Sequence, residues 1–168
     1  MNSVSEGNEG KGAVEIRLRA ESSAPAADVI AAARDFSERR IEIWPNVSAR
    51  RYEVHADGER FAEVTEAAAQ GVFWERSRYQ WPRAGSVRQI VIDSNILLPG
   101  STWEITATPD GDGCRVEAVF HRRFKRTLKG RFARLVNRRA GTHVYGYDLR
   151  RALAAIESQP PSAATEDR

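Results

Sequence analysis

The chain has 168 residues, 41% of them hydrophobic, and a formal net charge of +3. This length suits one domain with one core, and no apolar run approaches the ~20 residues of a membrane-spanning helix. The lone Cys114 excludes an intrachain disulfide, and residues 1–12 lack the basic start and apolar run of a signal peptide. We therefore expect a reduced, cytoplasmic protein.

The first part of the chain predicts one strand followed by two helices. Residues 1–12 are polar and glycine-rich, so we expect a disordered tail. Residues 13–20 alternate apolar and charged side chains, which predicts a half-buried strand. A helix is expected to begin near Pro25 and to run to about Phe36. Residues 37–45 predict a short second helix or turn.

The middle of the chain predicts an antiparallel meander. Six strands are expected at residues 47–56, 60–66, 72–81, 87–94, 102–108 and 114–122. The connections are short and carry Gly, Pro and Asp, which favours antiparallel neighbours because a parallel crossover needs a dozen residues or more. The first strand is expected to pair at an edge of this sheet.

Residues 129–157 predict one long helix, and the polar residues 158–168 after it are expected to be disordered. Steps of three and four residues place one stripe on the inner face of the helix: Phe132, Leu135, Arg139, Thr142, Gly146, Leu149, Leu153 and Ile156. Gly141 and Gly146 each disfavour a helix by about 1 kcal/mol. Close approach of the sheet or a ligand, or a local bend, would account for them.

These elements predict one α+β domain over residues 13–157. A seven-stranded curved antiparallel sheet is wrapped around the long C-terminal helix, and two short helices lie between the first and second strands. A curved sheet gripping one helix can leave a cavity between the two.

Several local motifs, in this order, resemble one known group of proteins. They are residues 14–36, Trp44-Pro45, residues 93–95, 99–105 and 113–116, and the closing helix. The chain resembles the START-like superfamily (also SRPBCC, or birch-pollen-allergen-like), particularly its bacterial polyketide cyclase/dehydrase and lipid-transport branch. The resemblance implies a helix-grip fold with a deep pocket for lipids, sterols, polyketides or other apolar molecules. Some members catalyse cyclisation or dehydration, but no shared catalytic motif exists, so no catalytic residue is carried over.

Strand alternation indicates which side chains face the helix. On residues 72–81 one face carries Arg76 and Arg78, which suit solvent, so the other face is expected inside. On later strands the expected inward sets are Ile90 and Ile92; Trp103, Ile105 and Ala107; and Val116, Ala118 and Phe120. A mostly apolar pocket with a few polar groups is typical of small-molecule sites. The predicted ligand-binding residues are Phe73, Glu75, Tyr79, Trp103, Phe120, Arg139, Thr142 and His143.

Two of these residues have alternative interpretations. Arg139 on an inner face needs a carboxylate, from Glu75 or from a ligand; otherwise its guanidinium extends to solvent at the pocket rim. His143 can act as a general acid or base, or can make an ordinary hydrogen bond at the helix margin. No histidine or cysteine spacing indicates a metal, and no glycine-rich phosphate loop is present, so no cofactor is expected.

These patterns, together with the resemblance, suggest three functions. The first is binding of an apolar small molecule or lipid. The second is a polyketide cyclase/dehydratase-like enzyme that uses Tyr79, Glu75, Arg139 or His143 as acid, base or anion stabiliser. The third is an interaction with an anionic membrane or nucleic acid, because ten Arg or Lys residues and one acid lie between Arg115 and Arg139. The helix face predicted for it carries Arg131, Arg134 and Arg138.

Overall fold

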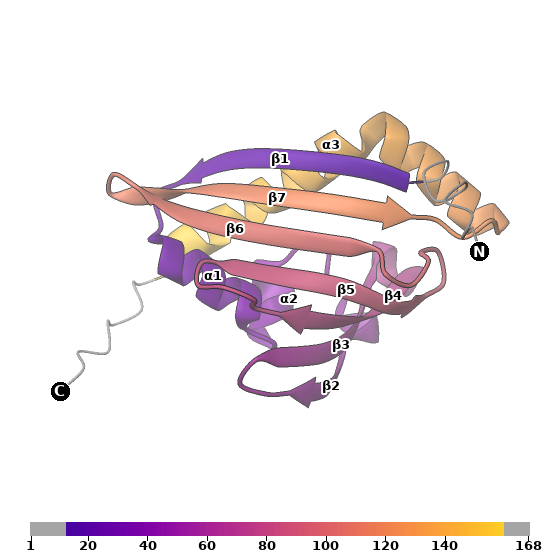
Figure 1. Ribbon diagram of the computed structural model, residues 1–168, viewed down its shortest axis with the longest axis horizontal. Coiled ribbons are helices and arrows are strands. Elements are labelled where there is room, and N and C mark those ends of the chain that lie inside the picture. Colours follow the sequence, from indigo (N-terminus) through magenta and orange to yellow (C-terminus); the bar gives the residue numbers. More distant parts are fainter. Residues whose placement is uncertain (1–12, 160–168) are drawn as a thin grey trace, which may run out of the picture.

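The computed structural model describes residues 13–159, and its elements follow the predicted order (Figure 1). Residues 1–12 and 160–168 of the two predicted tails lie outside the described residues. The strand predicted over 47–56 starts late, because a short 3₁₀ turn at Ala49–Arg51 precedes it. The elements are β1 (Ala13–Ser22), α1 (Ala26–Arg34), α2 (Arg39–Ile43), β2 (Glu53–Asp57), β3 (Phe61–Ala68), β4 (Phe73–Gln80), β5 (Ser86–Ser94), β6 (Thr102–Asp110), β7 (Gly113–Arg123) and α3 (Leu128–Glu157).

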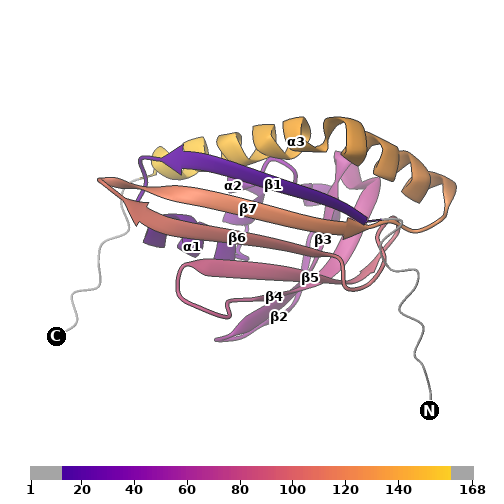
Figure 2. The same ribbon diagram turned by 45° about the horizontal axis from the view of Figure 1, so that its top comes forward.

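The strands form one antiparallel sheet in the order β1-β7-β6-β5-β4-β3-β2. Six strands are a meander and β1 closes one edge beside β7, as predicted. The sheet is curved, and α3 runs along it next to β1 (Figures 1 and 2). Helix α1 packs against β5, β6, β7 and α3. The expected α+β helix-grip architecture is confirmed.

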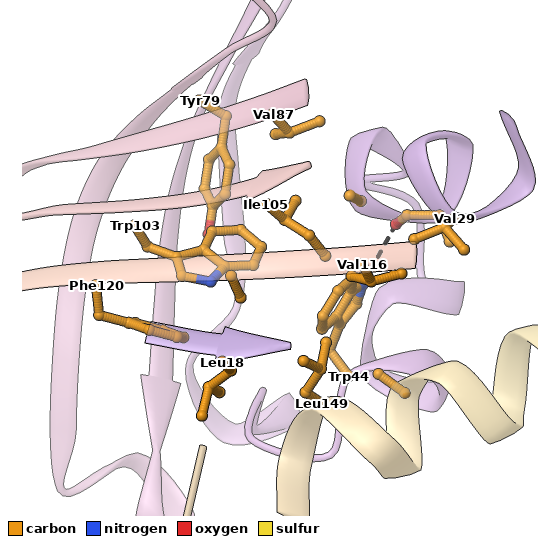
Figure 3. Packing of buried hydrophobic residues seen from close by; sticks show 14 of the residues in the cluster. Leu18, Val29, Trp44, Tyr79, Val87, Trp103, Ile105, Val116, Phe120 and Leu149 are labelled. Carbon is orange, nitrogen blue, oxygen red and sulfur yellow. Dashed lines mark hydrogen bonds between the residues drawn. The ribbon is translucent and has the colours of Figure 1, made fainter. Parts of the chain in front are cut away.

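The core lies between the sheet and these helices. Trp103 of β6 lies between Tyr79 of β4 and Phe120 of β7 (Figure 3), with ring centroids 6.4 and 6.1 Å away. Trp44, after α2, meets Trp103 edge-on and donates its Nε1–H to the carbonyl of Ala32 at 3.2 Å. The inward sets predicted for β6 and β7 are buried: Trp103, Ile105, Ala107, Val116, Ala118 and Phe120.

The inward set predicted for β5 is wrong. Tyr79 pairs with Gln89, so Gln89 and Val91 are buried on the inner face. The register shifts beyond that pair, which leaves Ile92 as a bulge and 42% exposed. Ile90 lies on the opposite face from Gln89. Strict alternation failed because a bulge interrupts it and because the inner face contains a polar side chain.

The first half of α3 is rotated relative to the predicted stripe. Its buried or half-buried inner residues are Ala133, Asn137, Gly141 and Tyr145. Phe132 and Leu135 are instead 61% and 51% exposed. Further along, Leu149, Leu153 and Ile156 are buried as predicted. The apolar residues of the first half therefore do not mark its inner face.

The two glycines of α3 have different surroundings. A Cβ at Gly141 would overlap Ile16 Cδ1 on β1, so close approach of the sheet accounts for this glycine. A Cβ at Gly146 would make only ordinary contacts, the nearest core atom being Leu18 Cδ2 at 3.8 Å. Gly141 thus sets how closely α3 approaches β1.

We expect Gly146→Ala to raise the free energy of unfolding by about 1 kcal/mol, the intrinsic helix preference of alanine. Gly141→Ala should give a smaller gain or a loss, because Ile16 is buried and must move. Urea unfolding of both variants measures the difference. Equal gains at the two positions would contradict the close approach at Gly141.

Candidate ligand-binding site

A cavity of about 430 Å³ lies between the first half of α3, the adjoining ends of β3 and β4, and the segment after β5. Most of its walls are apolar, including Val47, Ala67, Phe73, Leu97, Phe124 and Ala133. Phe132, Val136 and Val144 also line it and are exposed, so it reaches the surface beside α3. The expected pocket between sheet and helix is thus open at the first half of α3.

A smaller cavity of about 70 Å³ continues toward the core, where Tyr79, Trp103 and Phe120 line it. Six polar or ionisable residues line both cavities: Asn46, Glu66, Glu75, Arg122, Tyr145 and Asp148. The polar groups are therefore concentrated at the boundary between the apolar chamber and the aromatic core.

Glu75 joins two buried side chains at this boundary. Arg122 Nη1 lies 3.3 Å from Glu75 Oε2, and Gln89 Nε2 donates to Glu75 Oε1 at 2.6 Å. Burial acts to lower the pKa of Arg122, but the Glu75 carboxylate raises it overall, so the guanidinium stays charged. Among the described residues, Gln89 Oε1 and Arg122 Nε have no hydrogen-bond partner. An acceptor and a donor are thus buried here without a protein partner.

A second ion pair lies deeper. Arg40 is 2% exposed and donates its Nε–H to Glu66 Oε1, while Tyr79 donates its hydroxyl to Glu66 Oε2. Burial and the neighbouring Glu66 charge raise the pKa of Tyr79 well above its usual value. Tyr79 Oη also lies 3.2 Å from Gln89 Nε2, which links the two ion pairs. The network is buried and charge-balanced.

Helix α3 supplies two further groups. The Tyr145 ring stacks on Phe120 at 4.4 Å between centroids, and its hydroxyl donates to Asn137 Oδ1 at 2.8 Å. Burial raises the pKa of Tyr145, so it remains a neutral donor. Burial also raises the pKa of the half-buried Asp148, although the charge of Arg151 acts to lower it. Within residues 13–159, Asp148 makes no hydrogen bond and no close ion pair. Asp148 is the carboxyl group at the boundary that protein contacts leave available.

Asp148→Asn is expected to stabilise the protein at neutral pH. Between its ordinary pKa of 3.8 and its higher folded value, Asp148 binds more protons in the folded than in the unfolded state. The free energy of unfolding therefore falls as pH rises through that interval. Asparagine removes this penalty, so the gain should be present at pH 7 and vanish below the ordinary pKa. Urea unfolding at pH 7 and at a pH below 3.8 measures this difference. The exposed Asp112→Asn is the control for the loss of one negative charge.

The predicted site residues divide into two groups. Phe73 and Glu75 line the large cavity, and Tyr79, Trp103 and Phe120 line the deep one. Arg139, Thr142 and His143 are exposed on the outer side of α3 and line neither cavity. Their expected inward orientation is wrong because the first half of α3 presents another face. Arg139 follows the alternative in which its guanidinium reaches solvent.

Sequence reasoning missed Gln89, Arg122, Tyr145, Asp148 and the Arg40–Glu66 pair. Arg122 had a usable signal, because it continues the alternation of Ala118 and Phe120 by two residues. The other residues carry no such sequence signal, because they are polar side chains on faces where apolar side chains are expected. Their burial depends on partners from distant strands.

The described residues 13–159 contain no helix long and apolar enough to cross a membrane. Within the same range, no group of His, Cys, Asp and Glu residues is arranged to hold a metal ion.

A curved antiparallel sheet around a long helix, with a cavity between them, defines the START-like (SRPBCC) class. Solved structures of this fold include the ZhuI aromatase/cyclase from Streptomyces sp. R1128, with a TM-score of 0.73 and 16% identity, covering 90% of this chain and 98% of that one. A START superfamily protein from Mycobacterium smegmatis has a TM-score of 0.62 and 12% identity, with 85% and 94% covered. Truncated norcoclaurine synthase from Thalictrum flavum has a TM-score of 0.65 and 13% identity, with 88% and 96% covered.

The sequence profile of the family described as polyketide cyclase / dehydrase and lipid transport matches residues 13–158. The chain belongs to this family, as the resemblance predicted. No curated protein matches the chain by sequence. The structural neighbours, at these identities, establish the fold alone.

Proposed function

We propose that the chain binds an apolar small molecule or lipid in the cavity between the sheet and α3. This proposal rests on a 430 Å³ apolar cavity that has polar groups at its boundary with the smaller, deeper cavity. We call this boundary the inner end of the cavity. Small-molecule sites typically have volumes of about 300–1,000 Å³ and a few convergent polar groups. The family, whose description includes lipid transport, supports the same class of ligand.

The electrostatics of the inner end favour a neutral polar group on the ligand. Arg122 is already paired with Glu75, and Arg40 with Glu66, so the part of the chain that the structure describes places no unpaired cation here. The orphaned acceptor on Gln89 and donor on Arg122 suit a hydroxyl or a carbonyl. We infer a ligand with an extended apolar body and a hydroxyl or carbonyl group at the end that enters first.

Native mass spectrometry of the purified protein, followed by solvent extraction, tests this proposal. We expect a co-purified apolar molecule, or tight binding of an environment-sensitive apolar dye. A long-chain alcohol should displace that dye better than the fatty acid of the same length, because the inner end lacks a free cation. A protein that binds neither the dye nor the alcohol, and whose melting temperature neither one shifts, would refute it.

Catalysis of cyclisation or dehydration in the same cavity is the second candidate. It is favoured by a half-buried carboxyl group of raised pKa, Asp148, which lines both cavities together with the phenol of Tyr145. A carboxyl group in this environment can exchange a proton with a ligand carbonyl or hydroxyl. Asp148→Asn should then lower turnover of a polyketone substrate far more than it lowers dye binding. Equal losses would leave binding as the function.

The predicted interaction of the basic residues with a membrane or nucleic acid is the third proposal, supported by the exposure of Arg131 and Arg138. Arg134 is half-buried and takes part in contacts of its own. The cytoplasmic location, predicted from the single Cys114, likewise stays a proposal.

A further inference from the structure

The outer side of the first half of α3 carries apolar side chains that no other element within residues 13–159 covers. Leu128 is 85% exposed, Phe132 61% and Leu135 51%. Their spacing of four and three residues places them on one side of the helix. Both ribbon views show the start of α3, in orange, reaching past the start of β1 (Figures 1 and 2). Isolated exposed apolar residues are common, but a helical stripe of three large ones indicates an interaction surface.

Basic side chains flank this stripe. Lys129, Arg131 and Arg138 are exposed on the same half of α3, and no acidic residue occurs between Glu117 and Asp148. We call the six residues Leu128, Lys129, Arg131, Phe132, Leu135 and Arg138 the docking face. Its positive charge is therefore not compensated by acids of the same segment.

We propose that the docking face binds the surface of an anionic lipid bilayer. A helix that places apolar side chains among basic ones lies at the membrane interface, with its apolar residues among the acyl chains and its cations near anionic headgroups. Of the two partners predicted for the basic residues, an anionic membrane and nucleic acid, we choose the membrane because it accounts for the apolar stripe as well as the charge.

The docking face is continuous with the mouth of the large cavity. Phe132 belongs to the docking face and also lines the cavity, and the neighbouring Val136 and Val144 line it too. Docking would therefore hold the mouth against the acyl chains, so an apolar ligand could pass between bilayer and cavity without crossing water. This route rests on the proposed ligand binding, whereas docking itself does not.

Two other occupants fit the docking face less well. Nucleic acid would use the arginines and could stack on Phe132, but Leu128 and Leu135 offer it neither a stacking surface nor a hydrogen bond. A second copy joined through a two-fold axis would place the same cations against one another. An anionic bilayer satisfies both the apolar and the charged residues.

Co-sedimentation with vesicles tests the proposal. The full chain should bind vesicles of equal parts phosphatidylcholine and phosphatidylserine, bind pure phosphatidylcholine weakly, and be released by added salt. Arg131→Gln with Arg138→Gln should weaken binding roughly 30-fold, since each basic residue contributes a factor of about five. Leu128→Ser with Leu135→Ser should weaken it at least about tenfold. None of these four residues lines either cavity.

Arg60→Gln with Arg88→Gln is the matched control, because both arginines are exposed, lie off α3 and change the net charge equally. The control should bind like the wild type. Absence of binding to the anionic vesicles at low salt would overturn the proposal. So would RNA binding stronger than vesicle binding, or a dimer that the Leu128/Leu135 variant abolishes while vesicles stay unbound. Dye binding without vesicles is measured on the same variants, so failure of the ligand proposal is seen separately.

Discussion

Replacing Ala133 by phenylalanine is expected to weaken ligand binding roughly two hundredfold. Ala133 is 5% exposed and lines the large cavity, so the added benzyl group must occupy space that the ligand would use. Excluding about four ligand methylene groups, at about 0.8 kcal/mol each, corresponds to that loss in affinity. Dye titration of the variant against the wild type provides the measurement.

The matched control is Ala154→Phe, the same substitution at an exposed position of the same helix that lines neither cavity. It should bind dye and ligand like the wild type. Ala133→Phe should remain folded, because an existing space receives the ring. If Ala133→Phe kept full affinity, the ligand would lie elsewhere and the proposed site would be wrong.

Arg40→Met is expected to lower the free energy of unfolding by about 3–5 kcal/mol, a large part of the ~5–15 kcal/mol of a typical domain. The substitution removes the guanidinium that balances the buried Glu66, and it removes the donor to the Ala33 carbonyl at 3.2 Å. It also removes the cation above the rings of Phe36 and Tyr79, at 4.6 and 5.0 Å. Urea unfolding measures the loss.

A double-mutant cycle separates the ion pair from simple loss of packing. Arg40→Met with Glu66→Gln should recover a large share of the stability, because the amide leaves no buried charge and still accepts from Tyr79. The exposed pair Arg115–Asp110 is the control, and Arg115→Met should cost below about 1 kcal/mol. If the double variant is as unstable as Arg40→Met alone, the loss comes from packing and not from the unpaired carboxylate.

The sequence pattern was sufficient for the order of elements and for the architecture. Alternation in β1, β6 and β7, and short turns between strands, are local properties that depend on neighbouring residues. The helical repeat of α3 is equally local, so its bounds of Leu128–Glu157 differ from the predicted helix by one residue at the start. Phe73 and Glu75 were placed at the large cavity by the same alternation in β4.

The orientation of the first half of α3 was not predictable in this way. The periodicity of Phe132, Leu135, Arg139 and Thr142 is real, but an apolar stripe does not say what covers it. Here the core contact is made by small and polar residues, with Gly141 against Ile16 of β1. Leu135, Arg139 and Thr142 of the predicted stripe therefore face outward over this half, and Phe132 lies at the mouth of the cavity.

By itself, the sequence determined the family, the antiparallel meander, the closing helix and the excess of basic residues before Asp148. The tertiary structure alone decided which polar groups meet at the inner end of the cavity. Glu75, Gln89 and Arg122 belong to three strands, and Tyr145 and Asp148 to a helix far along the chain. Burial and charge pairing depend on partners distant in sequence. Local periodicity therefore revealed the elements, and packing between them formed the site.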